Sequence, residues 1–105
     1  MKKRAIITGA NGQLGSAFVE ALTEKGYFVY AVDLNIEKIK SSENVQPVKL
    51  DITDETAVHN FFSSVQSLNV LINNAGIGVF TPFEDRTAAE FKKVMEVNLL
   101  GAFLM

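Results

Sequence analysis

Three glycines, Gly9, Gly12 and Gly15, recur at every third position in the segment TGANGQLG, directly after the apolar residues 5–7. A glycine-rich turn between a strand and a helix can bend sharply, approach a phosphate without a Cβ in the way, and pack the helix tightly on the strand. The unpaired N–H groups at the start of that helix then face the phosphates. The spacing predicts a turn that binds the pyrophosphate of a dinucleotide, although similar turns also close loops that bind no ligand.

An acidic residue, Asp33, follows the apolar residues 27–32 and lies 18 positions after Gly15. In dinucleotide-binding folds a carboxylate about 20 residues beyond the glycines accepts hydrogen bonds from the adenosine ribose. It would repel a 2′-phosphate, and neither the glycine turn nor the position after Asp33 carries a lysine or arginine. We therefore expect NAD(H) rather than NADP(H). The alternative is an aspartate that starts a turn or caps a helix near residues 36–40.

Two further polar segments follow apolar runs farther along the chain. Asp51 and Ile52 come after the third run, and the sequence NNAG at residues 73–76 comes after the fourth. The carboxyl ends of parallel strands share one edge of a sheet, and open α/β sheets bind ligands at that edge. The small residues at the end of NNAG leave room there for a flat ligand. Taken alone, NNAG is also compatible with an ordinary turn from a strand into a loop.

Together, the TGxxGxxG segment, Asp33, the Asp-Ile pair and NNAG resemble the short-chain dehydrogenase/reductase family, over essentially the whole chain. The resemblance implies the N-terminal, cofactor-binding part of a reductase-type oxidoreductase that moves hydride between a nicotinamide and an alcohol or carbonyl substrate. The residues that match the family's NAD-binding positions are Gly9, Asn11, Gly12, Gln13, Leu14 and the close-packing Gly15 at the phosphates and adenosine ribose, Asp33 at the ribose, Asp51 and Ile52 at the adenine, and Asn74, Ala75 and Gly76 under the nicotinamide-side ribose. Asn73 is expected to tie strands together instead of contacting the ligand.

The glycine spacing departs from the reductase-type pattern, Thr-Gly-x-x-x-Gly-x-Gly, because Gly12 stands one position earlier. That placement resembles the extended members of the family, which modify sugar nucleotides. The NNAG segment and the later NLLG segment at residues 98–101 both resemble the reductase type. Two motifs therefore favour the reductase type over one displaced glycine, and an extended member is the alternative.

The family's proton-transfer groups, a Ser and a Tyr-x-x-x-Lys pair, have no match in these 105 residues. The two tyrosines, Tyr27 and Tyr30, fall in an expected strand, and the residues four positions later are Ala31 and Leu34. Asn98 matches a helix asparagine that supports a water-linked proton relay in the family, so we expect a supporting role at most. Its alternative role is a polar residue that caps or bends an apolar helix. Because hydride transfer to a carbonyl needs a positioned acid, we expect negligible catalysis by this chain alone.

The alternation of apolar runs with amphipathic segments predicts an α/β protein with one domain over residues 1–105. The expected strands are residues 3–8, 27–32, 47–50 and 70–72, and the expected helices are residues 12–25, 36–41, 55–64 and 88–105. Right-handed crossovers give a Rossmann-type, doubly wound parallel sheet of strand order 3-2-1-4, truncated after four strands and the following helix. The fourth strand would form an exposed edge.

The expected C-terminal helix is apolar on nearly every side in its last turns, so it needs cover from several directions. We expect the chain to be truncated and to form a homo-oligomer through this helix. The alternatives are a complete, non-catalytic NAD(H)-binding module that dimerises through the helix, and a gene remnant without a function of its own. Phe80 and Phe83 could border a substrate pocket, but covering the core is the expected role.

Composition makes several classes of function unexpected. With 48% hydrophobic residues, 21% charged residues, a net charge of −2 and no apolar stretch of about 20 residues, the sequence predicts a cytoplasmic domain without a membrane span. Residues 2–4 are basic, but no basic and aromatic segment follows them, so nucleic acid is not an expected partner. A metal site is not expected either, because the chain has no cysteine and a single histidine, His59.

Overall fold

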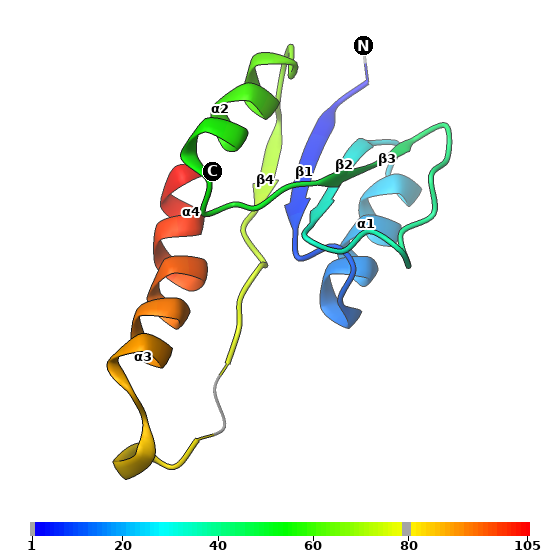
Figure 1. Ribbon diagram of the computed structural model, residues 1–105. Helices are drawn as coiled ribbons and strands as arrows, with labels where there is room; N and C mark the ends of the chain where they lie inside the picture. The colour runs from blue at the N-terminus through cyan, green and yellow to red at the C-terminus, as the bar shows by residue number, and fades with distance from the viewer. Residues whose placement is uncertain (1, 79–80) are drawn as a thin grey trace.

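The computed structural model describes residues 2–78 and 81–105 (Figure 1). Its central feature is a parallel four-stranded sheet of order β3-β2-β1-β4, which confirms the predicted α/β fold of Rossmann type. The strands are β1 (Arg4–Thr8), β2 (Phe28–Asp33), β3 (Val45–Lys49) and β4 (Val70–Ile72). Ile6 of β1 pairs with Tyr30 on one side and with Leu71 on the other, so β1 lies at the centre. The glycine turn therefore leaves the sheet at its middle.

The two faces of the sheet form two cores, because successive side chains of a strand point to opposite faces. Val29 and Ala31 of β2 face helix α1 (Gln13–Glu24), together with Ala5 and Ile7 of β1. On the opposite face, Tyr30 and Val32 pack with helix α2 (Glu55–Ser63) and with residues near the C-terminus. Helices cover both faces, as a doubly wound sheet requires.

Residues 36–41, which were predicted to form a helix, form a loop with a turn at residues 37–38. The prediction is wrong because two backbone N–H groups of this stretch, those of Glu37 and Lys38, donate to the side chains of Asn35 and Asn11, and the preceding N–H of Asn35 donates to Asp33. Such short-range bonds from side chains to the backbone compete with the hydrogen bonds of a helix. The connection from β2 to β3 is therefore irregular.

The boundaries of the other predicted elements shift by small amounts. β2 begins and ends one residue later than predicted, so Tyr27 precedes the strand and Asp33 closes it. β3 begins at Val45 instead of residue 47, because Val45 pairs with Val29. Helix α1 ends before Gly26, whose φ of 87° is typical of a glycine that terminates a helix.

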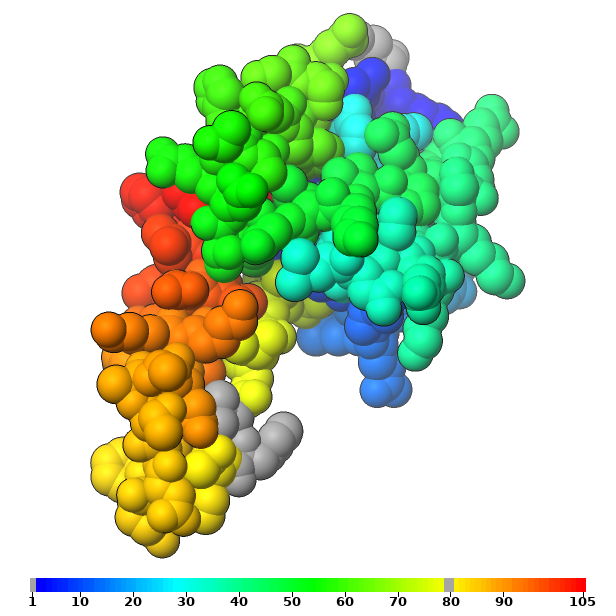
Figure 2. All heavy atoms as spheres, in the orientation of Figure 1, coloured from blue at the N-terminus to red at the C-terminus, as the bar shows by residue number. Residues whose placement is uncertain are grey.

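The C-terminal segment is helical but is not one regular α-helix. Helix α3 (Ala88–Met95) passes into the π-helical turn η2 (Glu96–Leu100) and then into helix α4 (Gly101–Leu104). The preceding 3₁₀ turn η1 (Phe83–Asp85) and helix α3 form an arm that extends below the body of the protein in Figure 2, whereas the end of α4 packs against the core. Phe83 is 87% exposed, so the prediction that it covers the core is wrong. Phe80 lies outside the described residues.

Candidate functional site

The glycine turn lies tightly against the loop that follows β4. Gly9 has a φ of 69°, and its carbonyl oxygen accepts a hydrogen bond from Gly12 N at 3.2 Å. A Cβ at Gly9 would stand 2.9 Å from Asn74 Nδ2, and a Cβ at Gly15 would stand 2.0 Å from the oxygen of Gly9. A side chain at either position would displace the turn, so glycine is required there on steric grounds.

Helix α1 begins at this turn with its first N–H groups free of a side-chain cap. Its N-cap is Gly12, and its first turn holds Gln13 and Leu14 but no acidic residue. Leu14 is 59% exposed beside the turn. The positive end of the helix dipole and these N–H groups favour an anion, which suits a pyrophosphate.

Thr8, which the analysis of the sequence did not single out as a site residue, joins the turn to the segment after β4. Its buried hydroxyl oxygen accepts hydrogen bonds from Asn74 N at 3.0 Å and Ala75 N at 2.9 Å. Asn74 Nδ2 also donates to the oxygen of Gly9 at 3.3 Å. The tie between the segments thus comes from Asn74, whereas Asn73, which was predicted to provide it, is exposed.

Asp33 ends β2 with both carboxylate oxygens held by backbone groups. Oδ2 accepts from Asn11 N at 3.0 Å, and Oδ1 accepts from Asn35 N at 3.2 Å. The half-buried carboxylate thus lies against the glycine turn. Each oxygen keeps a further lone pair for a ligand hydroxyl.

Asp51 and Ile52 occupy the loop after β3. Hydrogen bonds from Thr53, at 2.6 Å from its hydroxyl and 2.9 Å from its N–H, hold the pKa of the Asp51 carboxyl below its ordinary value. Asp51 is therefore an ionised acceptor at neutral pH. The buried Ile52 packs against Gly101, where a Cβ would approach to 2.6 Å from Ile52 Cδ1.

Asn98 lies inside the π-helical turn η2 and pairs with the backbone of Ile77 in both directions. Its Oδ1 accepts from Ile77 N at 2.8 Å, and its Nδ2 donates to the oxygen of Ile77 at 2.9 Å. A Cβ at Gly76 would lie 3.3 Å from Asn98 Oδ1. The asparagine therefore fixes the loop after β4 on the C-terminal helix. π-helical turns of this kind occur frequently at functional sites.

An open groove of about 140 Å³ runs along the carboxyl edge of the sheet. Six of the predicted site residues line it, namely Gly9, Asp33, Asp51, Ile52, Ala75 and Gly76. Leu34, Thr53 and Val97 also line the groove and were not predicted. Asn11, Gly12 and Gln13 border a separate cavity of about 640 Å³ between α1 and residues 38–45. Six of the predicted residues thus converge at this edge of the sheet, and the glycine turn lies between the two hollows.

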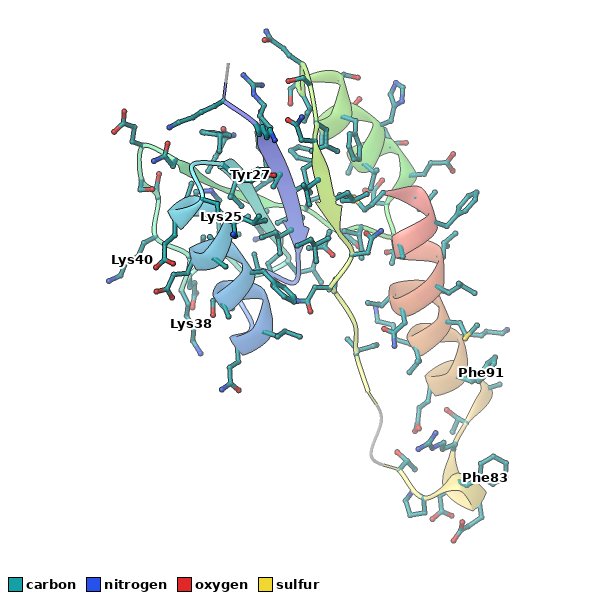
Figure 3. All side chains as sticks on the ribbon, turned by 180° about the vertical axis from the view of Figure 1, so that it is seen from behind. Lys25, Tyr27, Lys38, Lys40, Phe83 and Phe91 are labelled. Carbon is teal, nitrogen blue, oxygen red and sulfur yellow. The ribbon has the colours of Figure 1, made fainter. Side chains whose placement is uncertain are left out.

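Two lysines, Lys38 and Lys49, lie near this edge in the folded protein. Lys49 is paired with Asp33 in the register of β2 and β3. Lys38 donates its backbone N–H to Asn11 Oδ1 at 3.0 Å, and Figure 3 shows its side chain and that of Lys40 on the loop beside α1. Neither Lys38 nor Lys49 adjoins the glycine turn or Asp33 in the sequence. Their proximity to this edge follows only from strand pairing and from the path of the loop.

Within residues 2–78 and 81–105, the structure contains no group of three or more His, Cys, Asp or Glu side chains that could hold a metal ion. His59 is exposed on α2. No helix in the same residues is both long and apolar enough to cross a membrane.

Comparisons with known proteins agree with this arrangement. The family model for short chain dehydrogenases matches residues 3–105. Among solved structures, a short chain dehydrogenase from Leptospira borgpetersenii with bound NAD+ has a TM-score of 0.93 and 38% sequence identity to this chain. The match covers 99% of this chain and 43% of that one.

Two curated relatives differ in the cofactor that their names state. An NAD-dependent glycerol dehydrogenase of Listeria innocua is 29% identical, over 98% of this chain and 44% of its own length. An NADPH-dependent 1-acyldihydroxyacetone phosphate reductase of Saccharomyces cerevisiae is 30% identical, over 95% of this chain and 38% of its own length. The chain thus spans less than half the length of these relatives.

Proposed function

The chain belongs to the short-chain dehydrogenase family, and from this premise we propose that it is the cofactor-binding part of an oxidoreductase acting on an alcohol or carbonyl substrate. One observation carries the proposal: Gly9, Asp33 and the Ala75–Gly76 segment border the same groove. A bound nicotinamide dinucleotide would supply the hydride donor or acceptor. The residues of this chain bind and orient that group.

Each part of the groove suits one part of a dinucleotide. The uncapped start of α1 fits the phosphates, because its first N–H groups have no side-chain partner at the cap. Gly9 and Gly12 in the turn before it have no side chain that would obstruct a phosphate. Asp33 offers oxygens to the ribose, and ionised Asp51 offers oxygens to the adenine amino group. At the other end of the groove, Ala75 and Gly76 leave space beside the nicotinamide.

We favour NAD(H) over NADP(H) because the Asp33 carboxylate is held at the end of β2 by two backbone N–H groups. A fixed negative charge at this position repels a 2′-phosphate. Lys49 is the opposing influence, since strand pairing brings it beside Asp33. Its side chain is exposed, so solvent screens it more than the half-buried carboxylate.

For Asn98 we propose a positioning role. Its amide fixes the Ile77 backbone and, with it, the loop under the nicotinamide. A Ser and a Tyr-x-x-x-Lys pair, which would hold and move the substrate proton, are not among these 105 residues. We therefore propose that the chain as it stands binds cofactor without turnover.

We also propose that the exposed side of the C-terminal helix pairs with a second copy of the chain. Phe91, Leu99 and Phe103 are 65%, 60% and 81% exposed, and they border an apolar groove along α3, η2 and α4. A contiguous apolar surface of this kind marks an interaction site.

The test of the proposed function is a pair of fluorescence titrations of the purified protein with NADH and with NADPH. We expect NADH to bind at least tenfold more tightly, a difference of about 1.4 kcal/mol. Equal affinities for NADH and NADPH would contradict the proposed cofactor preference. Failure to bind either cofactor would contradict the proposed function. A parallel assay with NADH and a panel of aldehydes and ketones should show no oxidation of the cofactor.

A further inference from the structure

Four hydrogen bonds connect the glycine turn and the loop after β2 in a closed ring. Asp33 accepts from Asn11 N at 3.0 Å and from Asn35 N at 3.2 Å. Asn35 Oδ1 accepts from Glu37 N at 2.9 Å, and the next N–H, that of Lys38, donates to Asn11 Oδ1 at 3.0 Å. This series of hydrogen bonds thus begins and ends at Asn11 in the glycine turn. We refer to these five residues as the Asn35 ring.

Two consecutive Asx turns build the ring, one at Asp33 and one at Asn35. In each, a side-chain oxygen accepts from the backbone N–H two residues later. The second turn orients the N–H of Lys38 toward Asn11. Asn35 itself is exposed and does not line the groove that contains Asp33.

We propose that Asn35 is a positioning residue that holds the Asp33 carboxylate in place and thereby sets the preference for an adenosine ribose with a free 2′-hydroxyl. The inference rests on the proposed function, because it concerns how the same groove chooses its cofactor. It assigns a role to a residue that neither contacts the groove nor belongs to the motifs of the sequence.

A carboxylate held in one position distinguishes NADH from NADPH better than a mobile carboxylate does. A carboxylate already oriented toward the ribose loses little rotamer freedom when NADH binds, so its hydrogen bonds contribute more to affinity. A carboxylate that cannot swing away also keeps its full repulsion toward a 2′-phosphate. Loosening the ring should therefore weaken NADH binding and strengthen NADPH binding at the same time.

Nearby cations should increase the gain in NADPH affinity that follows when the ring loosens. Lys38 is part of the ring through its backbone, and Lys49 lines the hollow formed by residues 34–37. When the loop is ordered, the Asp33 carboxylate lies between the glycine turn and this loop. When the loop loosens, Lys38 gains the freedom to approach a 2′-phosphate, and Lys49, which strand pairing places beside Asp33, attracts the same phosphate.

The experiment compares Asn35→Ala, Asn35→Ser and the control Ser41→Ala, which changes an exposed, uncharged residue of the same loop that is outside the ring and lines neither hollow. Dissociation constants for NADH and NADPH are measured for each, and amide hydrogen exchange at residues 37 and 38 is followed by NMR without ligand. Asn35→Ala should reduce the ratio of the NADPH to the NADH dissociation constant about three- to tenfold, the effect of one net hydrogen bond. Exchange at both amides should also accelerate.

Asn35→Ser should restore part of the ratio, because a hydroxyl accepts from the same N–H more weakly. Ser41→Ala should match the wild type. The proposal is overturned if Asn35→Ala accelerates exchange and leaves the ratio of the dissociation constants unchanged, or if Ser41→Ala lowers that ratio equally. A wild-type protein that binds neither cofactor would instead contradict the proposed function, which the titrations reveal before any variant is made.

Discussion

The hydroxyl oxygen of Thr8 accepts a hydrogen bond from the backbone N–H of Ala75 at 2.9 Å. It accepts a second from Asn74 N at 3.0 Å, and the residue is 1% exposed. The end of β1 and the loop after β4 are therefore joined by one buried side chain. Both walls of the groove consequently depend on a residue that does not itself line the groove.

Thr8→Val should lower the free energy of unfolding by about 1–3 kcal/mol, because the change keeps the shape of the side chain but leaves two N–H groups without their acceptor. NADH binding should weaken as well, since the loop after β4 loses its tie to the turn. Urea unfolding followed by circular dichroism measures the first effect. The matched control is Thr8→Ser, which retains the acceptor, and an equal loss in both variants would contradict this explanation.

The sheet was predictable because β1, β2 and β4 contain short apolar runs that are followed by polar residues, although β3, with the sequence VQPVK, is more mixed. The order 3-2-1-4 follows from right-handed crossovers once the runs are recognised. The predicted Gly9, Asp33 and Ala75 meet in the groove for the same reason, since each follows a parallel strand and reaches the same edge. The position of a residue relative to the end of a strand can therefore be predicted from the sequence.

Other features depend on contacts that no local pattern encodes. The absent helix at residues 36–41 reflects the hydrogen bonds of Asp33, Asn35 and Asn11, two of which are local but compete with an equally plausible helical pattern. Lys49 reaches Asp33 only through strand register. The π-helical turn around Asn98 gives no change in apolar periodicity, so the sequence predicted one continuous helix.

Gly15→Ala should destabilise the protein by about 2–3 kcal/mol, the upper range for an overpacked site. The added Cβ would stand 2.0 Å from the oxygen of Gly9, and both partners are backbone that cannot rotate away. Thermal unfolding and NADH titration should both report the loss. Gly78→Ala is the control, because among the described residues beyond its chain neighbours no atom lies within 4 Å of its Cβ position. An unchanged melting temperature for Gly15→Ala would show that the turn can relax.

Asp33→Ala should reduce the preference for NADH over NADPH at least several-fold, because it removes both the acceptor for the ribose and the repulsion of a 2′-phosphate. Asp33→Asn separates the two effects. It keeps one acceptor oxygen but no charge, so NADPH affinity should rise while NADH affinity falls less than in Asp33→Ala. Parallel titrations with both cofactors measure this. If Asp33→Ala leaves the ratio of the two dissociation constants as it was, this carboxylate does not choose the cofactor.

The pKa of the Asp51 carboxyl should rise toward its ordinary value in Thr53→Val, since the side-chain hydrogen bond from Thr53 is the largest cause of its lowering. In the wild type the folded-state pKa lies below the unfolded one. Ionised Asp51 therefore stabilises the fold above about pH 4, and this contribution is lost as the pH falls through the folded-state pKa. Carboxyl ¹³C chemical shifts followed against pH measure the change. Thr56→Val, on the exposed side of α2, should leave the titration of Asp51 unaltered.

Leu99→Glu should weaken self-association at least tenfold, or about 1.4 kcal/mol, because it places a charge in the middle of the apolar groove of the C-terminal helix. In Figure 3, Phe91 and Phe83 extend from the arm that carries this surface. Sedimentation velocity at several concentrations should show dimers for the wild type and monomers for the variant. Leu68→Glu introduces the same charge at an exposed leucine outside the groove and should leave the dimer intact.

The C-terminal helix carries the apolar face on one side and contacts the loops that line the cofactor groove on the other. Asn98 pairs with Ile77 and Gly101 packs on Ile52, both on the side of the helix opposite Leu99. Leu99→Glu should therefore separate the subunits while the NADH dissociation constant changes less than about twofold, within the scatter of distant substitutions. A wild-type protein that sediments as a monomer at every concentration would eliminate the second copy as the partner of this face.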